Sequence, residues 1–153
     1  MVQGASGRGS NWWLGQPSAQ ALPLSGAIIV TLPQLVSLED ASRGLQMFRT
    51  LEVPILGVIE NMSYLDLPDG SRMDIFGSGG GEQLAAATET PFLGKIPIDP
   101  AVREGGDSGK PIVIAWPESA AGQALRQIAE SLAAKISVAA LGGKNELPIN
   151  IVD

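Results

Sequence analysis

An acid, an amide and a hydroxyl follow one another at the end of a predicted buried strand. The strand is expected over Ile55 to Ile59, and Glu60, Asn61 and Ser63 come directly after it. In open parallel α/β sheets, ligands bind just beyond the carboxyl ends of the strands. The Asn61 amide offers both a donor and an acceptor, which suits the edge of an adenine. The position predicts a small-molecule site at Asn61; the alternative is an asparagine that only caps the turn after the strand.

A second polar loop, Ile96 to Glu104, leaves another predicted strand. Within it, Asp99 stands where it can N-cap a helix whose first residue is Pro100. Capping alone explains Asp99 without any ligand. Three further acids, Asp66, Asp69 and Asp74, lie in an irregular loop. A solvated loop is favoured over a cation site there because no companion ligands accompany these acids.

Two glycine-rich segments look like phosphate-binding loops but fail their requirements. Gly77 to Gly81 follows an irregular loop instead of a strand and has Glu82 where the last glycine of G-x-G-x-x-G belongs. Gly105 to Lys110 is one residue short of the P-loop spacing and has Pro111 where a Ser or Thr would hold magnesium. A predicted strand also follows it where a helix is needed. We expect the glycines to serve positive-φ turns and close backbone approach.

The composition indicates a globular domain and excludes several classes of function. The chain has 153 residues, of which 44% are hydrophobic and 17% charged, and its net charge of -6 disfavours binding to nucleic acid or anionic lipid. With no Cys and no His, no disulfide, ordinary zinc site or protein-ligated iron–sulfur cluster is expected. No apolar run approaches the roughly 20 residues of a membrane span, and no secretory signal is apparent, so a cytoplasmic location is expected.

Strand and helix patterns alternate along the chain and predict an α/β fold with a parallel sheet and right-handed crossovers. The domain is expected over residues 24–138, between an irregular or disordered segment at 1–23 and a tail at 139–153. The first strand, Ala27 to Thr31, reads as buried on both faces because its run is apolar and β-branched. The remaining elements are expected as strands at Phe92 to Ile96 and Ile112 to Ile114, and helices at Ser37 to Thr50 (with Ser37 as N-cap), Gly81 to Thr88 and Ser119 to Ile136.

Five blocks follow one another along the chain, at Gly26 to Gln34, Gly57 to Tyr64, Ile75 to Gly81, Leu93 to Asp99 and Arg103 to Val113. In this order they resemble the Mrp/ApbC-like P-loop ATPases that carry or assemble iron–sulfur clusters, and the resemblance covers about Ala19 to Ala140. It implies the C-terminal part of a MinD/ParA-type domain, whose members use ATP and dimerise face to face. It also implies that Asn61, Pro97 and Asp99 surround the adenosine of ATP.

The chain departs from this family in two respects. Members commonly carry a Cys-x-x-Cys pair that holds a cluster between two subunits, and the corresponding insert here, Leu65 to Asp74, has no thiol. The family's N-terminal half, with its Walker A lysine, is not found in this sequence. Phosphoryl transfer needs those parts to cradle the phosphates. A truncated or frame-shifted reading frame would give this pattern.

The expected function is therefore a partial iron–sulfur cluster carrier ATPase of the Mrp type that keeps adenosine-side loops and is inactive by itself. No catalytic residue, metal ligand or bound cluster is expected. The partners implied by the resemblance are a second copy or a full-length relative, and iron–sulfur apoproteins. The alternative is a non-catalytic interaction module that pairs with a full-length relative or a separately encoded N-terminal half. A MinD-type positioning ATPase shares the fold but is disfavoured by the glycine block and by the lack of a basic amphipathic C-terminal helix.

Overall fold

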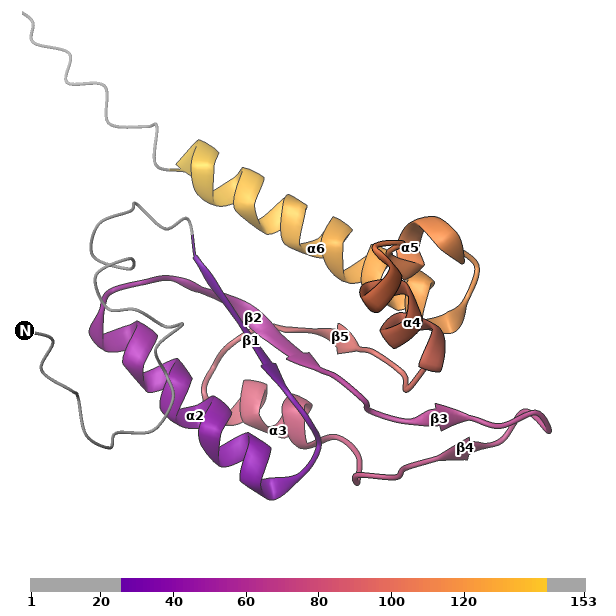
Figure 1. The fold of residues 1–153 in the computed structure, drawn as a ribbon. Helices are drawn as coiled ribbons and strands as arrows, with labels where there is room; N and C mark the ends of the chain where they lie inside the picture. The colour runs from indigo at the N-terminus through magenta and orange to yellow at the C-terminus, as the bar shows by residue number, and fades with distance from the viewer. Residues whose placement is uncertain (1–25, 143–153) are drawn as a thin grey trace, which may run out of the picture.

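A three-stranded parallel sheet forms the centre of the computed structural model, which describes residues 26–142. Its strands are β1 (Ala27–Thr31), β2 (Ile55–Glu60) and β5 (Phe92–Lys95), in the order β1-β2-β5 (Figure 1). All three run in the same direction, as the alternation of strand and helix patterns predicts. The carboxyl ends of the strands, and the loops that follow them, therefore meet at one edge of the sheet.

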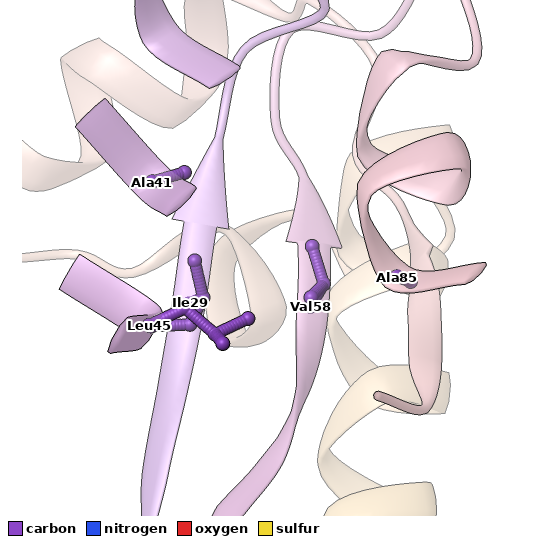
Figure 2. Packing of buried hydrophobic residues seen from close by; sticks show 5 residues of the cluster. All are labelled: Ile29, Ala41, Leu45, Val58 and Ala85. Carbon is purple, nitrogen blue, oxygen red and sulfur yellow. The ribbon is translucent and has the colours of Figure 1, made fainter. Parts of the chain in front are cut away.

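Two helices cover one face of the sheet. These are α2 (Leu35–Thr50) and α3 (Gly80–Ala87). Figure 2 shows the core between the helices and strands β1 and β2, and its buried members are Ile29, Ala41, Leu45, Val58 and Ala85. The helical spacing of Ala41 and Leu45 places both side chains on the inner face of α2.

The helix α6 (Ala120–Gly142) covers the opposite face (Figure 1). Its Ile128 is buried with Ile59 of β2 and Ile96, and Leu93 of β5 packs against this cluster. Because successive residues of a strand point to opposite faces, Val58 belongs to the first core and Ile59 to the second. The helix continues beyond Ile136, where the sequence pattern predicts its end.

Three smaller elements complete the described residues. A short antiparallel hairpin, β3 (Leu65–Asp66) and β4 (Arg72–Met73), extends away from the main sheet (Figure 1). The helix α4 (Pro100–Ser108) follows β5, and the one-turn helix α5 (Ile112–Ala115) packs near α6. The strand predicted over Ile112 to Ile114 is therefore wrong. A short apolar run does not distinguish strand from helix, and here only Ile112 is buried while Ile114 is 77% exposed.

The start of α2 also differs from its prediction. The helix begins at Leu35, and its N-cap is Gln34, whose side chain makes no capping hydrogen bond. Ser37 lies inside the first turn instead. Its hydroxyl accepts a hydrogen bond from the Leu32 backbone N–H (2.9 Å) and lies 3.0 Å from the Thr31 hydroxyl. Ser37 thus ties the helix back to the end of β1, and these bonds to residues five and six positions earlier replace the predicted capping box.

Strand β1 is buried on one face only, so the prediction of burial on both faces is wrong. Ile29 and Thr31 are buried towards α2, whereas Val30 is 58% exposed. The reason is that α6 packs mainly over β5 and β2. Of β1, the half-buried Ile28 packs against the cluster of Ile59, Ile96 and Ile128, and Val30 is left uncovered. Within residues 26–142, β1 pairs only with β2 and leaves its other edge open. A groove of about 590 Å³ runs between this strand and α2.

The boundaries predicted for the two terminal segments lie largely outside the described residues. Nothing in the structure tests the irregular segment at 1–23. Residues 139–142 of the predicted tail belong to α6, and the remainder lies outside the described part. No helix within residues 26–142 is long and apolar enough to span a bilayer.

Candidate functional site

The loops that follow β2 and β5 run side by side and bring the predicted site residues to one edge of the sheet. The pairing of the strands ends at Glu60 and Lys95. Beyond that point, the Ser63 N–H donates to the Ile96 carbonyl (3.0 Å), and the Ile98 N–H donates to the Tyr64 carbonyl (2.7 Å). Asn61 therefore lies on one segment, and Pro97 and Asp99 on the other, with hydrogen bonds joining the two segments.

Asn61 is half-buried at the first position after β2. Its backbone N–H donates to the Thr31 carbonyl of β1 (2.8 Å). Its side-chain oxygen accepts from the Met62 N–H (2.9 Å), so part of the amide serves the local turn, as the alternative interpretation expects. No group among residues 26–142 bonds to the Asn61 Nδ2. Both N–H groups of this Nδ2 are therefore unused within the described part of the chain.

Asp99 is the N-cap of α4. Its carboxylate accepts a hydrogen bond from the Ala101 N–H (2.9 Å), and Pro100 occupies the first helical position, as the sequence predicts. Asp99 is half-buried, whereas Pro97 is buried. Asp99 is therefore the member of this segment whose polar side chain reaches solvent.

The buried carboxylate of Glu60 is the feature of this site that sequence reasoning missed. Its side chain is completely buried. Oε1 accepts from the Ser63 hydroxyl (2.5 Å) and from the Gly79 N–H (3.3 Å), and Oε2 accepts from the Gly81 N–H (2.6 Å). The sequence signal for this contact is an acid at the end of an apolar strand, followed downstream by small residues that can approach it closely.

The glycine segment before α3 is built around this carboxylate. Gly79 has a φ of +74° and is the N-cap of α3, so its amide and that of Gly81 point from the helix start towards Glu60. A Cβ at Gly80 would meet the Pro33 carbonyl oxygen at 2.8 Å. These glycines provide the positive-φ turn and close approach that the sequence predicts. The amides that a phosphate would use are already bonded to an internal anion.

The second glycine segment is part of a helix end. Gly105 lies inside α4, where a Cβ would meet the Lys110 carbonyl oxygen at 2.5 Å, and Gly109 ends the helix with a φ of +70°. A short helix follows, not the predicted strand. Since no strand leads into this segment, its geometry is still not that of a P-loop.

The three acids of the hairpin region have protein partners or lie in solvent. Asp66 pairs with Arg72 (2.9 Å), whose guanidinium lies 4.1 Å from the centroid of the Tyr64 ring. The Asp69 carboxylate accepts from the hydroxyl of Ser71 (2.6 Å) and from its N–H (2.9 Å), and these bonds lower the Asp69 pKa. Asp74 is exposed. Among residues 26–142, no group of three or more His, Cys, Asp and Glu side chains is arranged to hold a metal ion.

Comparison with protein families gives a match over most of the chain. Residues 17–133 match the model described as "ParA: NUBPL iron-transfer P-loop NTPase". The chain is 53% identical, over 125 residues, to the iron–sulfur cluster carrier protein of Synechocystis sp., covering 80% of this chain and 35% of that relative. It is 51% identical, over 130 residues, to the iron–sulfur cluster carrier protein of Deinococcus radiodurans, covering 84% and 36%. The chain thus spans about a third of the length of these relatives.

The fold is similar to solved MinD structures. The cell division ATPase MinD of Pyrococcus furiosus superposes with a TM-score of 0.58 at 28% identity, covering 72% of this chain and 43% of that one. The septum site-determining protein MinD of Pyrococcus horikoshii, in complex with Mg-ADP, gives 0.57 at 28% identity, covering 75% and 44%. The parallel sheet with flanking helices is therefore part of the P-loop NTPase fold of MinD-like proteins.

Proposed function

The chain belongs to the ParA family of NUBPL-type iron-transfer P-loop NTPases, and we propose that it forms the nucleoside-side part of the ATP site of an iron–sulfur cluster carrier. The observation that carries this proposal is the joining of the loops after β2 and β5. The Ser63–Ile96 and Ile98–Tyr64 backbone hydrogen bonds hold the two loops together at the carboxyl ends of parallel strands, where α/β proteins bind ligands.

Asn61 and Asp99 are the residues proposed to hold the nucleoside, with Pro97 behind them. The Asn61 amide keeps its Nδ2 donor for an acceptor on the edge of the base. One oxygen of Asp99 caps α4, and a carboxylate has further lone pairs to accept from a sugar hydroxyl. The donors and acceptors of these loops thus fit a nucleoside.

This chain does not offer groups that fit a polyphosphate or an iron–sulfur cluster. The helix-start amides of α3 are bonded to Glu60, and the sequence contains no G-x-x-x-x-G-K-[ST] segment. Its lack of cysteine and histidine leaves no ordinary protein ligand for an iron–sulfur cluster. We therefore assign neither phosphate binding nor cluster binding to this chain. In the proposed assembly the residues that bind the phosphates and the cluster lie outside this sequence, and apoproteins that accept clusters are the proposed clients.

A second candidate function is an interaction module without nucleotide binding. The open edge of β1 and the exposed Val30 favour it, because an unpaired strand edge accepts another strand. The module would pair with a relative through this edge and contribute structure but no ligand contact. Nucleoside binding distinguishes the two functions.

Titration calorimetry with adenosine and with ADP tests the proposal. We expect weak binding of both ligands with similar dissociation constants, independent of magnesium, because only the nucleoside is contacted. Asn61→Ala should weaken both by about 10-fold, the effect of losing one hydrogen bond and leaving its partner unpaired. Gln83→Ala, an exposed amide on α3, is the matched control and should change nothing.

Two results would contradict the proposal. Absence of adenosine binding by the folded chain would favour the interaction module. Magnesium-dependent binding of ADP, much tighter than that of adenosine, would show that the chain holds phosphates after all.

A further inference from the structure

The buried carboxylate of Glu60 contacts both the turn that carries Asn61 and the start of α3. Glu60 has no exposed surface, and burying a charge costs free energy unless hydrogen bonds compensate for it. Within residues 26–142 the compensation comes from one hydroxyl and two amides and not from a Lys or Arg. The amides belong to the start of α3, where the helix dipole favours a negative charge.

The two oxygens of Glu60 have different partners. Oε1 lies 2.5 Å from the Ser63 hydroxyl, on the turn that carries Asn61, and 3.3 Å from the Gly79 nitrogen. Oε2 lies 2.6 Å from the Gly81 nitrogen, within the first turn of α3. Hydrogen bonds to a charged acceptor are stronger than neutral ones, so each contact restrains the segment that provides the donor.

The turn on the Oε1 side needs such a restraint. Met62 has a φ of +52°, a left-handed conformation that is unfavourable for a residue with a side chain. Met62 lies between Asn61 and Ser63. The Ser63 hydroxyl bond to Glu60, with the Ser63 N–H bond to Ile96, closes the turn around this strained residue. The direction of the Asn61 side chain is thus fixed by the residues on either side of it.

We propose that Glu60 is a positioning residue that couples the Asn61 turn to the start of α3. The inference rests on the proposed function, since it gives Asn61 a nucleoside to hold. Glu60 does not touch the ligand. It keeps the Asn61 amide oriented, and any displacement of α3 is transmitted to the turn through the carboxylate. In this proposal, the amides of Gly79 and Gly81 link α3 to Glu60 and do not bind a phosphate.

Hydrogen exchange combined with adenosine titration tests the coupling in the full 153-residue chain. Ser63→Ala removes only the bond to the turn. It should raise exchange at residues 61–63 and weaken adenosine binding by about 10-fold, while the Gly81 amide keeps its protection. Glu60→Gln replaces one accepting oxygen by an NH2 group, which cannot accept a hydrogen bond. The bonds to both segments are therefore weakened, and hydrogen exchange should rise at residues 61–63 and also at 79–81. The double variant should bind adenosine no more weakly than Glu60→Gln alone, because both changes break the same link. Glu89→Gln, which removes an exposed acid at the far end of α3, is the control.

The outcomes separate this inference from the proposed function. If the parent chain does not bind adenosine, the proposed function fails, and the exchange pattern still decides the coupling. Unchanged exchange at 61–63 in Ser63→Ala, or effects of Glu60→Gln confined to 79–81, would overturn the coupling. If Glu60→Gln does not fold, Ser63→Ala decides alone, since its exchange at 61–63 either rises or does not.

Discussion

A Cβ at position 81 would lie 2.9 Å from the Cβ of Glu60, closer than real Cβ contacts allow. The contact is close because the Gly81 N–H donates to the Glu60 carboxylate at 2.6 Å, which draws the first turn of α3 against the end of β2. The two residues are far apart in the sequence. Their contact explains both the glycine and the buried acid.

Gly81→Ala should therefore destabilise the fold. The added methyl group must push α3 away from β2, an overpacking effect of about 1–3 kcal/mol in the free energy of unfolding. Urea denaturation measures it. Gly106→Ala is the control: that glycine is also helical, has open space around it, and should gain about 0.5–1 kcal/mol. Equal stability of the two variants would show that the approach of Gly81 to Glu60 is looser than described.

Asp99 should act as a cap whether or not it contacts a nucleoside. Asp99→Ala removes the acceptor of the Ala101 N–H and should cost about 1 kcal/mol of unfolding free energy. Asp99→Asn keeps a capping oxygen, so thermal unfolding should be close to that of the parent. Loss of adenosine affinity in Asp99→Asn without loss of stability would separate the ligand role from the cap. An Asp99→Ala variant as stable as the parent would contradict the cap itself.

The turn of the β3–β4 hairpin should weaken in acid. The Ser71 hydroxyl, and then its N–H, hold the Asp69 pKa below the ordinary value of 3.8. Because the folded pKa lies below the unfolded one, the stabilising contribution is present above about pH 3.8 and is lost as the pH falls through the folded pKa. An NMR titration of the Asp69 carboxyl should show a midpoint below 3.8 that rises in Ser71→Ala and not in Ser78→Ala. A midpoint unaffected by Ser71→Ala would refute this description of the turn.

The edge of β1 that has no partner strand within residues 26–142 should make the chain self-associate. Unpaired strand edges next to exposed apolar residues accept another strand, and Val30 is 58% exposed beside this edge. Sedimentation should show concentration-dependent association that Val30→Lys reduces. Ile114→Lys, at an apolar position on α5 that is more exposed than Val30, should not reduce it. A monodisperse monomer at all concentrations would exclude the open edge as an association site.

Local patterns in the sequence were sufficient where one segment determines its own structure. The apolar β-branched run around Ile29 and the Asp99-Pro100 pair predict a strand and a helix start, and both are present. Ile112 to Ile114 has the same composition as a strand, but the turn after Pro111 and burial of Ile112 alone favour a helix. Three apolar residues carry too little periodicity to decide this.

Features that depend on distant partners could not be predicted in the same way. The exposure of Val30 depends on where α6 lies. Glu60 is the clearest case, because two of its donors are the Gly79 and Gly81 amides. These glycines follow the β3–β4 hairpin in the sequence and lie beside Glu60 only in the folded chain. Asn61 could be singled out because it directly follows a strand, whereas the nucleoside role of Pro97 and Asp99 is implied only by the family resemblance.

Photoaffinity labelling with 8-azidoadenosine tests the central claim, that the loops after β2 and β5 together bind the nucleoside. The label should attach to residues 61–64 or 96–99, should be displaced by adenosine and by ADP to a similar extent, and should be strongly reduced in Asn61→Ala. Labelling confined to the glycine segments 77–81 or 105–110, or labelling that Asn61→Ala leaves unchanged, would contradict the claim.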